Sequence, residues 1–71
     1  MLRVERVRVN DGSGNAVIDF QASTVSDLPT KGASFGSLKV CAGSIAQIIQ
    51  TGVFATLDED GKWYADGSEV S

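Results

Sequence analysis

The sequence predicts a small all-β protein, a meander or half-barrel of five or six short strands in a single domain over residues 1–71. Apolar and polar residues alternate in several short segments, and clusters of Gly, Asn, Asp and Ser separate these segments. No stretch keeps a helical period for the usual length of a helix, and a chain of this length holds one domain.

The first expected strand spans residues 2–9, where apolar and charged side chains alternate. The phase slips in the middle, because the apolar residues up to Val4 are even-numbered and those from Val7 onward are odd-numbered. Such a slip indicates a β-bulge near Arg6, or a strand that buries different faces at its two ends. Because bulges are common at sheet edges, we expect an edge or crossing strand.

Residues 10–15 are all turn formers and predict a hairpin loop. The strand that follows, residues 16–22, has apolar side chains at its even positions, so one face is buried. Residues 23–36 lack any period and form a connector, which Leu28 and Phe35 are expected to pin to the core. Residues 37–42 alternate again and predict a further strand.

Residues 44–51 fit two structures. Their apolar spacing suits a short helix with Ser44 as N-cap and Gly52 just beyond its end. A strand is favoured, because eight residues make only two helical turns and three of them are the β-former isoleucine. A turn at Thr51-Gly52 then leads into a strand over residues 53–57.

The C-terminal part predicts an acidic turn at residues 58–61, a return strand at residues 62–65 and a fraying end at residues 69–71. Neighbouring side chains of a strand point to opposite faces. We therefore expect Trp63 in the core and Tyr64 on the surface.

The residue types argue against an enzyme. There is no histidine and one cysteine, Cys41, so His-based catalytic sites, a structural zinc cage and an intrachain disulfide are excluded. The acidic turn lacks the ligand spacing of a calcium loop, and Gly12-Ser13-Gly14 lacks the third glycine of a nucleotide-binding motif. No cofactor or metal is expected, and Cys41 is assigned to the core.

Charge bears on partners and location. A net charge of −3 disfavours nucleic acid, and no apolar stretch reaches the length of a membrane helix. With no signal peptide recognised, we expect a soluble protein in a reducing cytoplasm. The charge is uneven, because residues 1–9 carry three arginines and one glutamate, whereas residues 58–71 carry five carboxylates and one lysine. These unlike poles would permit self-association, although two solvated surfaces also explain them.

The small size of the chain also favours contacts with other protein subunits. A core built from 71 residues contributes only a few kcal/mol, and neither disulfides nor a metal can supplement it here. We therefore expect contacts with other subunits, including a homo-oligomer.

A resemblance supports this expectation. Asp27-Leu28-Pro29-Thr30, Gly43-Ser44-Ile45-Ala46, Gln50-Thr51-Gly52 and Gly61-Lys62-Trp63-Tyr64 follow an order that resembles small virion proteins of tailed bacteriophages, such as capsid-associated auxiliary or head-fibre-base proteins. It covers residues 27–65. The strand after Gly52 lacks the Tyr-x-Phe sequence expected in such virion proteins. This departure weakens the case for a shared ligand more than the case for a shared fold.

The resemblance implies a non-catalytic structural role in many copies on the virion, which assembles in the host cytoplasm. The partners would be the major capsid protein or other virion proteins. The alternatives are an acidic inhibitor or adaptor of a host protein and a carbohydrate-binding module that uses Tyr64 or Trp63. The candidate interface residues are Arg3, Arg6, Arg8, Phe35 and Tyr64.

Overall fold

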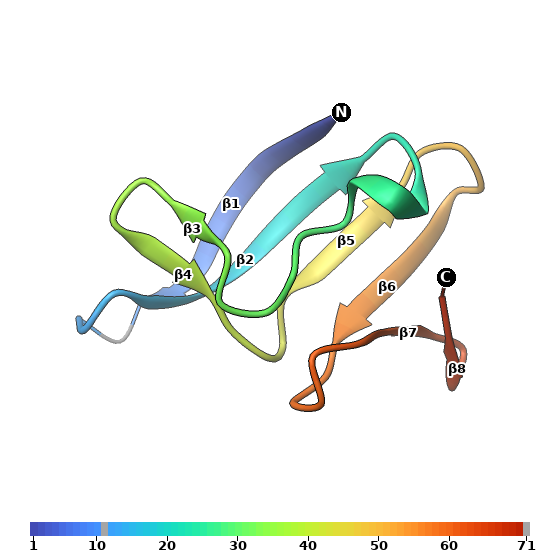
Figure 1. The fold of residues 1–71 in the computed structure, drawn as a ribbon. Helices are drawn as coiled ribbons and strands as arrows, with labels where there is room; N and C mark the ends of the chain where they lie inside the picture. Colours follow the sequence, from blue (N-terminus) through green and yellow to red (C-terminus); the bar gives the residue numbers. More distant parts are fainter. Residues whose placement is uncertain (11, 71) are drawn as a thin grey trace.

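The computed structural model describes residues 1–10 and 12–70. In this part of the chain the strands form one curled, half-barrel sheet, which confirms the predicted all-β fold, but there are eight strands rather than the five or six expected (Figure 1). The elements are β1 (Leu2–Asn10), β2 (Asn15–Ala22), the 3-10 turn η1 (Val25–Asp27), β3 (Ser34–Phe35), β4 (Leu38–Val40), β5 (Ile45–Ile48), β6 (Val53–Leu57), β7 (Trp63–Ala65) and β8 (Ser68–Glu69). No helix within the described ranges has the length and apolar character to cross a membrane.

β1 and β2 form the expected antiparallel hairpin. The register shifts between Val4 and Arg6, which confirms the predicted bulge, and shifts again between Val7 and Val9. Among the described residues β1 pairs only with β2, so it is an edge strand as expected. Asp11 of the expected hairpin loop lies outside the described residues.

The sheet departs from a simple meander at β2. On the side away from β1, the start of β2 (Asn15 and Ala16) pairs in parallel with β4, and its end (residues 19–22) pairs in parallel with β5. Parallel neighbours need a crossover connection. The long connector, residues 23–36, provides it by crossing the buried face of the sheet (Figure 1).

Residues 45–48 form a strand, which decides between the two structures that the sequence left open. β5 pairs antiparallel with β6, and its burial alternates, with Ala46 and Ile48 buried and Ile45 and Gln47 half-buried. A helix would instead have buried Ile45 and Ile49 on the same side as Ile48, but Ile49 is exposed.

The C-terminal end differs from the expected fraying. Residues 68–69 form β8, which pairs with β7, and the Val70 amide donates to the Trp63 carbonyl at 2.9 Å. Asp66 and Gly67 both have positive φ, the conformation of a tight hairpin turn that the sequence interpretation overlooked. Ser71 lies outside the described residues.

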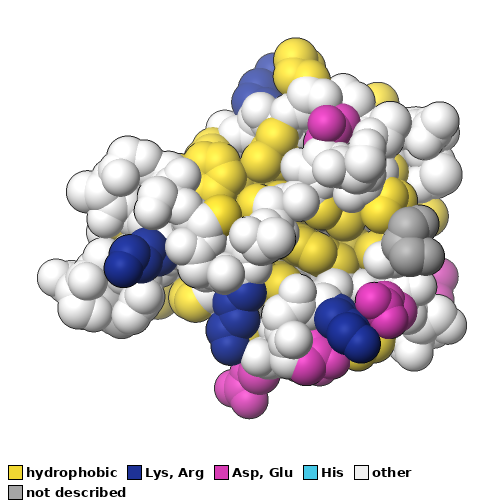
Figure 2. Space-filling view, viewed as in Figure 1, with side chains coloured by type: hydrophobic (Ala, Val, Ile, Leu, Met, Phe, Trp, Pro, Cys, Tyr) yellow, Lys and Arg dark blue, Asp and Glu magenta, His cyan; other side chains and the backbone are white. Residues whose placement is uncertain are grey.

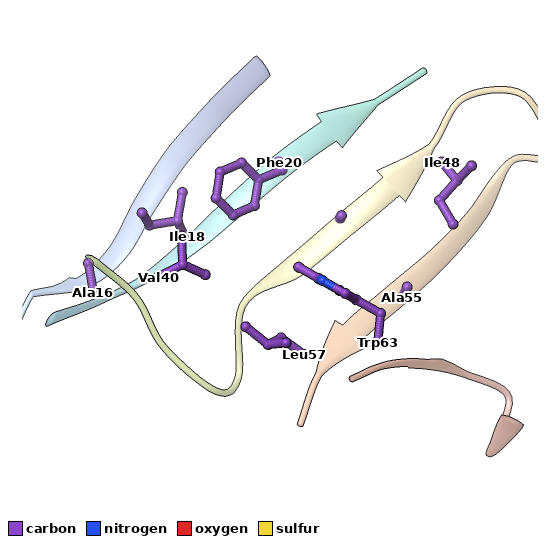
Figure 3. Close-up of a cluster of buried hydrophobic side chains, with 9 residues drawn as sticks. Ala16, Ile18, Phe20, Val40, Ile48, Ala55, Leu57 and Trp63 are labelled. Atoms are coloured by element: carbon purple, nitrogen blue, oxygen red, sulfur yellow. The ribbon is translucent and has the colours of Figure 1, made fainter. Parts of the chain in front are cut away.

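The core lies on the concave side of the sheet. Its buried side chains are Ala16, Ile18, Phe20, Val40, Ala46, Ile48, Ala55, Leu57 and Trp63 (Figure 3). The connector covers them, with Leu28 and Phe35 packed against the core as predicted. Apolar side chains still show through in the centre of this side (Figure 2).

Trp63 has the buried position that its place in the alternation predicts. Its side chain is 6% exposed, and Nε1 donates to the Pro29 carbonyl at 2.8 Å, which ties the connector to β7. The expectation that Cys41 lies in the core is wrong: the residue is half-buried and outside the core cluster, because its Sγ donates to the Ala16 carbonyl at 3.0 Å.

Candidate functional site

The most distinctive surface is the outer face of the sheet, opposite the core. In β2, β5 and β6 the residues between the buried ones point to this face. The register places Arg3, Gln21, Gln47 and Phe54 side by side across four strands. We call these four residues the outer row.

Hydrogen bonds fix most of the outer row. Arg3 Nη2 donates to Gln21 Oε1 at 2.7 Å, and Gln21 Nε2 donates to Gln47 Oε1 at 3.1 Å. Arg3 Nη2 also contacts Glu5 Oε1 at 2.8 Å. The polar side chains therefore hold one another in place beside Phe54.

Phe54 is the exposed aromatic of this face. Its side chain is 64% exposed, although aromatic residues commonly bury a large apolar area. A shallow groove of about 290 Å³ lies beside it, lined by Glu5, Asp19, Gln21, Ile45, Gln47 and Phe54. A groove with an apolar wall and prearranged amide and carboxylate groups can receive a protruding side chain from another molecule.

The candidate arginines border this groove. Asp19 accepts from Arg6 Nη2 at 3.1 Å and from Arg8 Nε at 2.6 Å, and Arg8 Nη2 also donates to the Gly43 carbonyl at 2.9 Å. The Arg8 side chain is only 32% exposed, whereas those of Arg3 and Arg6 are 61% and 68% exposed. Arg3 and Arg6 are thus the ones most accessible to a partner.

Phe35 lies away from this surface. Its ring packs against Phe20 on the concave side, with ring centroids 5.1 Å apart. Phe35 is half-buried and contributes to the core, so the structure does not bring it together with the candidate arginines.

Tyr64 faces outward on β7 but lies outside the groove. It pairs with Thr56, and its hydroxyl donates to Asp60 Oδ2 at 2.6 Å. This hydrogen bond raises the pKa of Tyr64 to about 12 and lowers the pKa of Asp60 below its usual range. The Tyr64 hydroxyl is therefore neutral, and its proton is already donated in a hydrogen bond to Asp60 in the acidic turn.

The described residues offer no cluster of metal-ligating side chains. No group of three or more Cys, Asp or Glu side chains among them is placed to hold a metal ion. Trp63, one of the two alternative residues of the carbohydrate interpretation, is buried and cannot stack on a sugar, which leaves Tyr64 for that role.

Sequence reasoning missed Phe54, Gln21 and Gln47 as surface candidates. One signal was present, because Thr56 marks the even-numbered face of β6 as the solvent face and Phe54 shares that face. The two glutamines lie on different strands, and only the parallel pairing of β2 with β5 makes them neighbours.

No protein-family model matches the chain, and no curated protein or solved structure matches it either.

Proposed function

We propose that this chain is a non-catalytic docking module of a tailed bacteriophage, an auxiliary or decoration protein bound in many copies to the virion shell. The observation that carries the docking role is Phe54, a large aromatic left 64% exposed beside a groove that Ile45 and polar side chains also line. Exposed aromatics that meet a partner pocket commonly dominate the binding energy of an interface.

The surroundings of Phe54 suit a protein partner. The outer row is held by hydrogen bonds before any partner arrives, so little side-chain entropy is lost on binding. The exposed guanidinium groups of Arg3 and Arg6 border the same surface and can pair with carboxylates of a neighbour. An apolar anchor with a charged border is typical of protein interfaces.

The virion assignment rests on the resemblance. Its residues occupy positions that determine the fold: Gly43 and Gly61 adopt positive φ at turns, Ser44 is fully buried and Trp63 closes the core. The resemblance therefore supports a shared fold, and the many-copy role follows from the class of protein it resembles. The proposed partner is the major capsid protein or another virion protein, at the shell surface.

The test is cosedimentation with empty capsids of the phage whose genome carries the coding sequence. The wild-type chain should pellet with the capsids, and Phe54→Ala should bind at least about tenfold more weakly, a loss of about 1.4 kcal/mol. Ile49→Ala is the matched control, because Ile49 is also a large exposed apolar residue, 53% exposed, but does not line the groove.

Three results would contradict the proposal. A wild-type chain that stays in the supernatant would rule out the virion role. Equal pelleting of Phe54→Ala and wild type would show that the docking surface lies outside the groove. A coding sequence located far from any capsid gene would also count against it.

A further inference from the structure

The two ends of the sheet carry opposite charge. Among the described residues, β3 is an edge strand that pairs only with β4. The sheet has two further edge strands: β1, which pairs only with β2, and β8, which pairs only with β7 (Figure 1). An edge strand presents unpaired backbone groups to which another chain can add. The charges beside these two edges therefore influence which chain can approach.

The β1 edge is basic and partly apolar. Residues 3–10 are all exposed, and their three arginines outnumber the single Glu5. Val4 and Val7 are each 40% exposed, and Val9 is 55% exposed. Covering these valines would remove apolar surface from water, which favours association.

The opposite end is acidic. Asp66 and Glu69 are exposed in the β7–β8 hairpin, and the turn before β7 adds Asp58, Glu59 and Asp60. Two lysines offset part of this charge. Lys31 Nζ donates to the Glu59 carbonyl at 2.8 Å, and Lys62 Nζ lies 3.8 Å from Glu69 Oε1, a long contact between two half-exposed side chains that contributes little. The Glu69 carboxylate thus remains available for a stronger ion pair.

Charge decides between the two ways in which copies could meet. Pairing of β1 with β1 of a second copy would bring two arginine-rich strands together, and like charges across paired strands are destabilising. Contact of β1 with the acidic end of a second copy brings unlike charges together.

We propose that copies of this chain associate head to tail, with β1 of one copy against the β7–β8 hairpin of the next. Arg3 and Arg6 would pair with Asp66 and Glu69 of the neighbouring copy. Such an interface uses different surfaces on the two partners, so it leaves one free edge of each kind and builds a ring or an open chain.

The contact is expected to be weak in solution. β8 is two residues long, and the two bulges of β1 interrupt straight backbone pairing, so side-chain charges contribute much of the attraction. Exposed ion pairs are screened by salt. The average mass should therefore rise with protein concentration and fall as salt is added.

Sedimentation of two neutralised variants tests the arrangement. Arg3→Gln/Arg6→Gln removes charge from the basic edge and leaves Asp19 paired with Arg8. Asp66→Asn/Glu69→Gln removes charge from the acidic end, and asparagine tolerates the positive φ at position 66. Each variant alone should remain monomeric at concentrations where the wild type associates.

The decisive sample is an equal mixture of the two variants. Each retains the edge that the other lacks, so the mixture should form pairs of chains and grow no further. Lys39→Gln, which removes an exposed charge on β4 rather than on β1 or the β7–β8 hairpin, should assemble like the wild type.

Three outcomes would overturn the proposal: a wild type that stays monomeric at every concentration, a neutralised variant that still assembles alone, or a mixture that stays monomeric while the wild type associates. Trp63 fluorescence would show that each variant is folded. Association at the sheet edges uses Arg3 and Arg6, which border the groove, but it does not use Phe54. Phe54→Ala should therefore assemble normally even though it fails to bind capsids, so the two proposals can fail separately.

Discussion

Ser44 lies at the point where β2 changes from pairing with β4 to pairing with β5. β2 changes partner from β4 to β5 along one edge, and Ile18 lies in the gap between the two paired segments. Ser44 Oγ accepts from the Ile18 amide at 3.1 Å and donates to the Cys41 carbonyl at 2.8 Å. A side chain thus replaces the missing strand partner, which explains why a polar residue is fully buried here.

Ser44→Ala should destabilise the protein by about 1–3 kcal/mol, because the buried Ile18 amide loses its acceptor. Urea unfolding followed by Trp63 fluorescence measures the change. Ser37→Ala, at an exposed position, is the control and should stay within about 0.5 kcal/mol of the wild type. Equal stability of the two variants would mean that water replaces the hydroxyl without cost.

Tyr64 and Asp60 give the surface a measurable pH response. The chain has one tyrosine, so the ultraviolet absorbance of its phenolate reports Tyr64 alone. The midpoint should lie at about 12 and fall toward 10.0 in Asp60→Asn, because the charged acceptor that favours the protonated phenol is gone. An unchanged midpoint in Asp60→Asn would contradict this assignment.

The effect of this pair on stability has a definite sign at each end of the pH scale. The pKa of Tyr64 in the folded state is raised above 10.0. Its contribution to folding stability is therefore complete below pH 10 and is lost as the pH rises through about 12. The folded pKa of Asp60 is lowered from 3.8, so its contribution is present above that value and is lost as the pH falls through the folded pKa.

At the scale of single elements, the alternation of β5 determines which of two neighbouring isoleucines contributes to stability. Ile48 is 1% exposed at the end of the strand, whereas its neighbour Ile49 is 53% exposed. Ile48→Ala should cost about 2–5 kcal/mol by leaving a cavity in the core. Ile49→Ala should change stability by less than about 0.5 kcal/mol. Chemical denaturation of both variants measures the difference, and similar large losses in both would indicate the helix instead.

The strands that the sequence predicts well are those with local signals. β2 has an unbroken alternation, and the bulge in β1 follows from the slipped phase around Arg6. The parallel pairing of β2 with β5 has no such signal, because it depends on how the connector crosses the core. β8 was missed for a different reason, since Asp66-Gly67 reads equally as a strand end and as a hairpin turn.

The candidate site was predictable only in part, for the same reason. The arginines of β1 were found because the strand and its charge are local in sequence. The groove was not found, because it forms where Glu5, Gln21, Gln47 and Phe54 meet from four strands. Phe35 was expected to pin the connector to the core and was also named as an interface candidate; its ring packs on Phe20, which confirms the first expectation and places it away from the groove.

At the scale of the whole molecule, five strands share one core. β2, β4, β5, β6 and β7 all contribute buried side chains to it, and the Trp63–Pro29 hydrogen bond ties the connector to the last of them. A domain of this size has too little buried surface for either half of the sheet to remain folded alone. Local unfolding of the hairpin β1–β2 or of β6–β8 would expose the core to water.

We therefore expect a single cooperative unfolding transition. Trp63, the one tryptophan, reports the β7 side of the core by fluorescence, whereas far-ultraviolet circular dichroism reports the whole sheet. Their midpoints in urea should coincide. Leu57→Ala, a core truncation expected to cost about 2–5 kcal/mol, should shift both midpoints equally. A dichroism signal that persists after the fluorescence change would show that the β1–β2 half folds independently, since Trp63 lies at the other end of the sheet.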